Sequence, residues 1–260
     1  MFITQGQMLA MIFAFLFPAI CSAALFVYLH RKMHTDHTGL GGAAAYGFAG
    51  YVWQEILYML CLVLMTKFSW FENLNENLYL LVSLLYALLS AFFVAFGMYW
   101  IIRKIKAKTE EADKYLWRVC AVGIGFSAGN IGWNLLVPYC SSLYYAARIN
   151  TGIFYGSQSL AESVASSSVS GMMLDGLKGA WMLLIYVALA LIMGIYMKEK
   201  PKASAVIGVL VPFGISIVNA LVGYFGCGTT VAQVVIQIFL VLLAAAGSYL
   251  VWIRLLRKKS

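Results

Sequence analysis

The sequence predicts an all-α polytopic membrane protein, a bundle of about seven transmembrane helices with its N-terminus outside and its C-terminus in the cytoplasm. Of its 260 residues, 63% are hydrophobic and only 11% are charged, and the mean hydropathy is +0.86. A soluble domain carries about 25% charged residues, so most of this surface is expected to face lipid. Residues 1–260 are therefore expected to form a single membrane domain of a multi-pass cell-membrane protein.

Seven continuous apolar runs approach or exceed the length of about 20 residues that a membrane-spanning helix needs. These runs are Met8–Tyr28, Ala43–Met65, Leu78–Ile102, Val119–Val137, Ala180–Met197, Ala205–Phe225 and Val231–Trp252. Strands of a membrane barrel would alternate apolar and polar residues, and these runs do not.

Features of the individual runs support their assignment as spanning helices. Met8–Tyr28 has no basic segment before it and no convincing cleavage site, so we expect it to span rather than to be a signal peptide. The second and fourth runs carry the polar side chains described below, and the third and seventh precede basic clusters. Trp181 and Tyr196 would suit the two interfaces of the fifth run, which is the shortest. Pro212 is expected to distort the sixth.

The positions of the 18 Lys and Arg residues predict the orientation. With the N-terminus outside, only Lys67, Arg148 and Lys178 fall in outer segments, and the other fifteen fall in inner ones. The inner residues are Arg31, Lys32, Arg103, Lys104, Lys106, Lys108, Lys114, Arg118, Lys198, Lys200, Lys202, Arg254, Arg257, Lys258 and Lys259. This bias follows the positive-inside rule across all seven runs. Nucleic-acid binding is not expected, because the net charge of +8 comes from these short clusters.

One long outer connection is expected from Pro138 to Gly179. Its Ser-rich part contains Ser159 and, three residues later, Glu162, which is the spacing of a capping box that opens a short helix. A flexible loop is the alternative.

Glu55 is the acidic residue nearest the middle of a predicted span, and Gln54 precedes it. An ionisable group at that depth costs about 2.5–3.5 kcal/mol on insertion scales, so it usually faces the bundle interior with a partner. Glu55 could contact a substrate, a proton or a partner helix. It could equally be a protonated side chain with one interhelical hydrogen bond.

The fourth run combines small residues with two amides. Gly125, Gly129 and Gly132 give a small-residue face that permits close helix packing. Asn130 and Asn134 are four residues apart and therefore lie on one helix face. The two amides could bridge helices, coordinate a ligand carbonyl or simply lock the bundle.

Other polar residues are less informative. Asn219 is the main amide of the sixth run. His30, His34 and His37 cluster with Asp36 in an inner loop, where they could bind a metal, but an exposed, Gly-flanked loop favours solvated histidines. We expect neither a metal site nor a cofactor.

The third and fourth runs, from Leu81 to Leu136, resemble the YhfC-like branch of the intramembrane protease superfamily. That superfamily also contains the CAAX prenyl endopeptidases and the Aph subunit of γ-secretase. The resemblance covers about half of the chain and rests on pattern and order, with a similar seven-helix topology.

The resemblance implies a site without its catalytic groups. The family's Glu-Glu-x-x-Arg-Tyr pattern falls on residues 94–99, where only Tyr99 matches. Its Gly-x-Gly-His-Gly-x-x-Glu pattern places Asn130 and Asn134 where the His and Glu would stand. The next family His falls near Tyr186, and the last pattern falls near Ile215 with Asn219 retained. Amides cannot act as a general base near neutral pH.

A disulfide between Cys140 and Cys227 is a further expectation, since both follow the outer ends of predicted spans. The helices that carry the family motifs line one cavity in that superfamily, which favours the pairing. Two free outer thiols are the alternative.

The expected function is that of a non-catalytic scaffold or partner-binding subunit, as the Aph subunit is, contacting lipid and helices of a partner membrane protein. The candidate partner-binding residues are Glu55, Gln54, Asn130, Asn134, Asn219 and Tyr186, and no catalytic residue is expected. A transporter subunit that uses Glu55 is the second hypothesis. An intramembrane protease with displaced catalytic residues is the third.

Overall fold

The computed structural model describes residues 2–32, 37–68, 79–109, 111–152, 158–226 and 230–256. Within these ranges, seven helices are long and apolar enough to cross a membrane, which confirms the predicted polytopic bundle. In chain order the elements are α1 (Gln5–Lys32), α2 (His37–Met65), α4 (Tyr79–Lys108), α5 (Ala112–Ile131), the π-helical segment η1 (Gly132–Leu136), α6 (Val137–Asn150), α7 (Gln158–Ser166), α8 (Val169–Glu199), α9 (Pro201–Gly226) and α10 (Thr230–Leu256).

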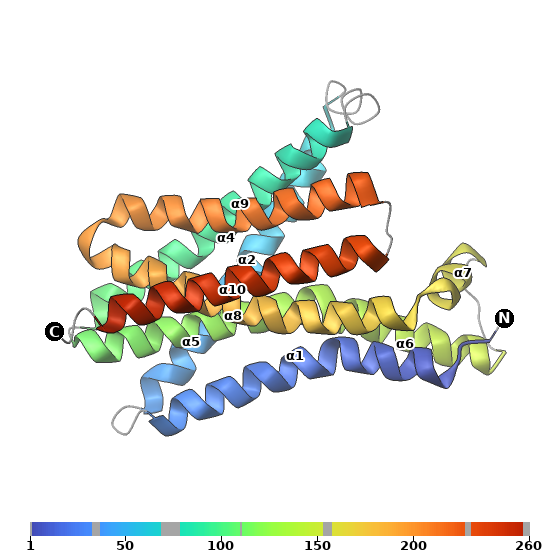
Figure 1. The fold of residues 1–260 in the computed structure, drawn as a ribbon, viewed down its shortest axis with the longest axis horizontal. Coiled ribbons are helices and arrows are strands. Elements are labelled where there is room, and N and C mark those ends of the chain that lie inside the picture. The colour runs from blue at the N-terminus through green and yellow to red at the C-terminus, as the bar shows by residue number, and fades with distance from the viewer. Residues whose placement is uncertain are drawn as a thin grey trace.

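Helix α8 holds the bundle together. It packs against α1, α5, α9 and α10, while α2 packs against α5 and α4 packs against α9. In Figure 1 most of the long helices run along the same axis, α2 and α4 cross them obliquely, and the two termini lie at opposite ends. We call the end near the N-terminus the outer end and the opposite, basic end the inner end, following the positive-inside rule.

The spanning helices are longer than the apolar runs suggest. Helix α8, for example, begins at Val169 rather than Ala180, and α4 continues to Lys108 rather than ending at Ile102. Hydropathy marks only the lipid-facing part of a helix, whereas backbone hydrogen bonding continues the helix through the interface. Ser168 caps α8 by accepting a hydrogen bond from the Gly171 N–H at 3.0 Å.

The predicted long connection from Pro138 to Gly179 is wrong. Helix α5 continues through η1 into α6, so one helical path runs from Lys114 to Asn150, which at 1.5 Å per residue is roughly 55 Å long. That length exceeds the hydrocarbon core of about 30 Å, so α6 extends beyond it at the outer end. The Ser-rich stretch forms the short helix α7, which confirms the helical alternative, although α7 begins at Gln158, one residue before Ser159.

Pro138 gives a physical reason for the π-helical segment. A proline inside a helix has no N–H for the carbonyl four residues before it, and its ring clashes with that carbonyl. Here that residue is Asn134, in the middle of η1. The wider turn is closed by a hydrogen bond from the Val137 N–H to the Gly132 carbonyl, and the helix passes the proline without ending.

The outer end is tied together by side-chain amides. The Asn150 side chain accepts from the Ile3 N–H at 2.8 Å and donates to the Ile3 carbonyl at 2.9 Å. Gln7 Nε2 donates to the carbonyls of Ala165 and Ser167 at 2.9 and 3.1 Å. These bonds join the start of the chain to α6, to the last turn of α7 and to the residue that follows α7.

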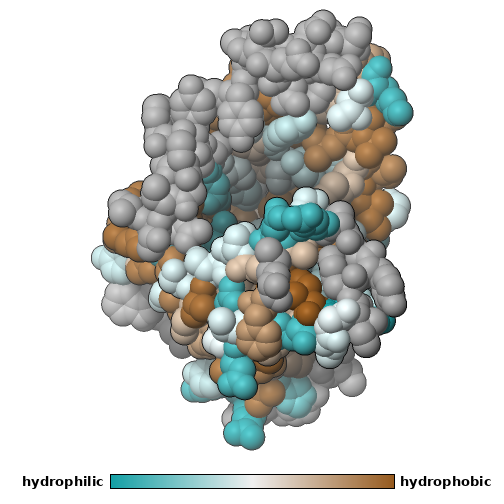
Figure 2. Space-filling view, turned by 90° about the vertical axis from the view of Figure 1, so that its right-hand side faces the viewer, coloured by the Kyte–Doolittle hydropathy of each residue, from teal (hydrophilic) through white to brown (hydrophobic). Residues whose placement is uncertain are grey.

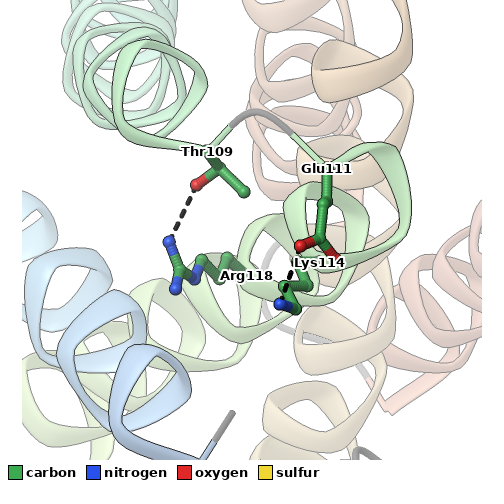
Figure 3. A network of polar contacts seen from close by, with 4 residues as sticks. All are labelled: Thr109, Glu111, Lys114 and Arg118. Carbon is green, nitrogen blue, oxygen red and sulfur yellow. Dashed lines mark hydrogen bonds and ion pairs between the residues drawn. The ribbon is translucent and has the colours of Figure 1, made fainter. Parts of the chain in front are cut away.

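The inner end is held by basic residues between α4 and α5 (Figure 3). Arg118 Nη1 donates to Thr109 Oγ1 at 2.9 Å, and Lys114 Nζ lies 2.9 Å from Glu111 Oε1. Lys106 Nζ donates to the Met197 carbonyl at 2.8 Å, which joins α4 to α8.

Glycines bring α2 and α5 into backbone contact. A Cβ added to Gly125 would overlap the Ala44 carbonyl, and one added to Gly129 would lie 2.7 Å from Tyr51 Cβ. From the other side, a Cβ on Gly47 would overlap the Val122 carbonyl. The predicted close packing is confirmed at Gly125 and Gly129. Gly132, by contrast, begins the π-helical segment and has only an ordinary contact with Phe48.

Candidate functional site

A polar network centred on Tyr51 lies where α2 meets α5. Asn130 Nδ2 and Asn134 Nδ2 both donate to Tyr51 Oη, at 2.9 and 2.7 Å. A hydroxyl group accepts at two positions and donates one proton. The two amides therefore occupy both acceptor positions and direct the hydroxyl proton elsewhere, toward the carboxyl group of Glu55, with which Tyr51 also interacts.

Glu55 lies one turn after Tyr51 on α2 and is 9% exposed, while Gln54 is 1% exposed. Gln54 Nε2 donates to Glu55 Oε2 at 3.0 Å. The carboxyl group thus has a hydrogen-bond donor from its own helix, as a buried acidic group requires, and the Tyr51 hydroxyl also interacts with it. Gln54 Oε1 is buried and has no partner among the described residues.

The structure brings five of the six predicted residues together. Tyr186 on α8 is buried, and its ring lies 5.3 Å from that of Phe126, which in turn lies 5.1 Å from the Tyr51 ring. Asn219 is the exception, because it lies on α9, which packs against α4, α8 and α10. Its Oδ1 atom is buried with no partner in the described part of the chain.

A cavity of about 520 Å³ adjoins the network on its outer side, and we call it the outer cavity. Asn130 and Asn134 line it together with residues of α6 and α8. The π-helical segment forms part of its wall, and such segments occur frequently at functional sites. Figure 2 looks onto the outer end and shows this face hollowed between two lobes, with hydrophilic side chains inside the hollow.

Charged groups of both signs line the outer cavity. Asp175 on α8 accepts a hydrogen bond from the Tyr139 hydroxyl at 2.6 Å. Lys178, three residues later on the same helix, also lines the cavity. Among the described residues its ammonium group has neither a hydrogen bond nor an ion pair. The cavity therefore offers a half-buried cation to an anionic group.

Sequence reasoning missed Tyr51, Tyr139, Asp175 and Lys178 as members of the site. Tyr51 carries a usable signal, since it precedes Glu55 by four residues and so shares its helix face. Asp175 and Lys178 were placed in a loop, because the apolar run of α8 begins only after them. Nothing in the sequence pairs Tyr139 with Asp175.

The histidine cluster of the first inner loop is described only in part. His34 and Asp36 lie outside the described residues, and within the described ranges no three His, Cys, Asp or Glu side chains are close enough to hold a metal.

The predicted disulfide also involves an undescribed residue. Cys140 is exposed on α6 with a free thiol. Cys227 lies outside the described residues, so its pairing with Cys140 stays a prediction.

The chain was compared with protein-family models, with curated proteins and with solved structures. None of the three comparisons finds a match to it. The resemblance to the YhfC-like branch therefore stays a prediction, and the site must be interpreted from its own geometry. That geometry is a hydrogen-bonded network inside a membrane bundle, next to a polar cavity with an available cation.

Proposed function

We propose that this protein is a non-catalytic membrane subunit, a degenerate relative of the YhfC-like intramembrane proteases, that binds a partner membrane protein at its outer cavity. The partner contributes a segment that carries a carboxylate group. The network around Tyr51 fixes the wall of that cavity and takes no part in bond cleavage.

The arrangement of Glu55 supports a non-catalytic role. A general base must reach the water or hydroxyl group whose proton it removes. Glu55 is held by Gln54 and Tyr51, and it is not among the residues that line the outer cavity. The groups that do reach the cavity from this network are the amides of Asn130 and Asn134, which are neutral and not basic.

Lys178 is the single observation that carries the proposal. Asp175, which could have paired with it, is instead bound by Tyr139 at 2.6 Å. A half-buried ammonium group without an anion is costly, and a carboxylate from a partner would remove that cost. The same group would then be flanked by the amide donors of Asn130 and Asn134 at the inner end of the cavity.

Substitution of Lys178 tests this role. A photo-crosslinking residue at Ser142, which lines the cavity, is expected to capture one stoichiometric membrane partner from native membranes. In mild detergent, Lys178→Gln is expected to weaken retention of that partner at least about ten-fold, because removal of one half of a desolvated charge pair costs about 2–5 kcal/mol. Quantitative mass spectrometry of the purified complex measures the loss.

Lys67→Gln is the matched control, because it removes the same charge from the outer end at an exposed position that does not line the cavity. It should retain the partner. Equal retention by Lys178→Gln and wild type, or equal crosslinking from Leu250 on the exposed face of α10, would rule out the outer cavity as the binding site.

One observation favours a second function, that of a transporter subunit. Hydrogen bonds lead from the outer cavity through Asn130 or Asn134 to Tyr51, which also interacts with Glu55 one turn further along α2. Ionisable residues inside a membrane bundle mark ion pathways and proton relays in pumps and transporters. Proton movement through Glu55 would distinguish this function from partner binding.

A further inference from the structure

A second cavity opens on the side of the bundle, between the inner halves of α2 and α4. It has a volume of about 430 Å³ and is lined almost entirely by apolar and aromatic side chains. We call it the α2–α4 groove. It shares no lining residue with the outer cavity, although Gln54, which donates to Glu55, also lines the groove. Lipid binding in this groove does not depend on the function proposed above.

Glycines shape the floor of this groove. A Cβ on Gly97 would lie 3.3 Å from the Gly50 carbonyl oxygen, and a Cβ on Gly50 would overlap the Ile101 side chain. The two helix backbones therefore approach closely at the floor. Large aromatic side chains form the rim, and Trp53 and Trp100 are 60% and 50% exposed. The groove is thus open to the lipid around the bundle.

The length of the groove matches one leaflet of a bilayer. It extends along α4 from Phe96 to Lys108, and twelve residues of helix rise by roughly 18 Å. Half of a hydrocarbon core of about 30 Å is about 15 Å. An acyl chain that lies in the groove would span its leaflet from the interface to the middle of the membrane.

The inner end of the groove carries only positive charge. Lys104 and Lys108 both line it, one turn apart on α4, and no lining residue is acidic. Lys104 Nζ lies 5.1 Å from the centroid of the Trp100 ring. Neither lysine has a hydrogen bond or an ion pair within the part of the chain that the structure describes. Both ammonium groups are therefore available to a headgroup at the interface.

We propose that the α2–α4 groove binds an anionic phospholipid of the inner leaflet. Its acyl chain lies against Trp53, Phe96 and Trp100, and its phosphate lies between Lys104 and Lys108. Basic pockets between transmembrane helices on the cytoplasmic side bind anionic headgroups in this way, and that leaflet is where anionic lipids are enriched. A neutral lipid would fill the apolar part but would leave both lysines without a counter-charge.

Tryptophan quenching tests the proposal on the full-length protein in vesicles. Phosphatidylcholine vesicles receive a small mole fraction of either phosphatidylglycerol or phosphatidylcholine with brominated acyl chains, which quench adjacent indole rings. We expect brominated phosphatidylglycerol to quench more than brominated phosphatidylcholine. The excess should disappear in Trp53→Phe/Trp100→Phe, because those are the two tryptophans of the groove.

The charge variants identify the headgroup site. Lys104→Gln/Lys108→Gln is expected to lower the apparent affinity for phosphatidylglycerol roughly five-fold per lysine, since each basic residue near an anionic surface contributes about 1 kcal/mol. Arg103→Gln/Lys202→Gln removes the same charge from the same end outside the groove and should leave the affinity unchanged. Equal quenching by the two lipids, an excess that persists without Trp53 and Trp100, or an equal loss in the control pair would each overturn the proposal.

Discussion

Gly125→Ala is expected to destabilise the bundle, because its new Cβ would overlap the Ala44 carbonyl where α2 and α5 pack. The obstacle is a main-chain group, which cannot move as a flexible side chain can, so the two helices must separate. Overpacking of this kind costs about 1–3 kcal/mol. Gly47→Ala should have a similar effect from the α2 side, where its Cβ would overlap the Val122 carbonyl. The midpoint of thermal unfolding in detergent measures both losses.

Gly42→Ala is the matched control for this prediction. Gly42 also lies in α2, but a Cβ there has nothing within 4 Å. Alanine is favoured over glycine inside a helix by about 0.8–1.0 kcal/mol, so Gly42→Ala should be neutral or stabilising. If Gly125→Ala and Gly42→Ala unfold at the same temperature, α2 and α5 do not pack as closely as described.

Tyr51→Phe is expected to have the second large effect. It removes only a hydroxyl group, but that hydroxyl accepts hydrogen bonds from Asn130 and Asn134 and also interacts with Glu55. Of these partners Glu55 is buried, Asn130 is half-buried and Asn134 is exposed. A buried polar group left unsatisfied costs about 1–3 kcal/mol, and we expect a loss of about that size. Tyr46→Phe, at an exposed position of the same helix, should change stability by less than about 0.5 kcal/mol.

A double-mutant cycle tests whether the loss comes from the hydrogen bond between Tyr51 and Asn134. Replacing both partners of a hydrogen bond by apolar groups can be nearly neutral, and Asn134 and Tyr51 are two such partners. Asn134→Leu combined with Tyr51→Phe should therefore be less destabilising than the sum of the two single changes. Strict additivity of the three measured stabilities would mean that Asn134 and Tyr51 do not interact.

The sequence correctly predicted the seven spanning helices, because each of them contains a long apolar run. It failed between Pro138 and Gly179, where polar and aromatic residues interrupt the apolar pattern although the backbone remains helical. A proline such as Pro138 usually marks a helix end, but the π-helical segment before it absorbs the lost hydrogen bond. Hydropathy carries no information about helical segments outside the lipid core, so α6 and α7 could not be found in that way.

The sequence drew attention to Asn130 and Asn134 but not to Tyr51, the residue to which both amides donate. Asn130 and Asn134 were expected on one face, and they converge on one atom, Tyr51 Oη. Which helix faces them depends on the packing of α2 against α5, which is set by glycine contacts that no single sequence displays. The pairing of Tyr139 with Asp175 across α6 and α8 depends in the same way on tertiary structure.

Glu55 decides whether the network is a structural frame or a chemical site. Wild-type protein and Glu55→Gln are compared in liposomes that contain a pH-sensitive dye and a membrane-anchored reporter substrate, with Glu162→Gln on α7 as the control. We predict that all three show no cleavage and no proton flux above that of empty liposomes, and that all three retain the partner captured through Ser142. Cleavage or proton flux that is present in the wild type and in Glu162→Gln but lost in Glu55→Gln would contradict the non-catalytic, partner-binding role.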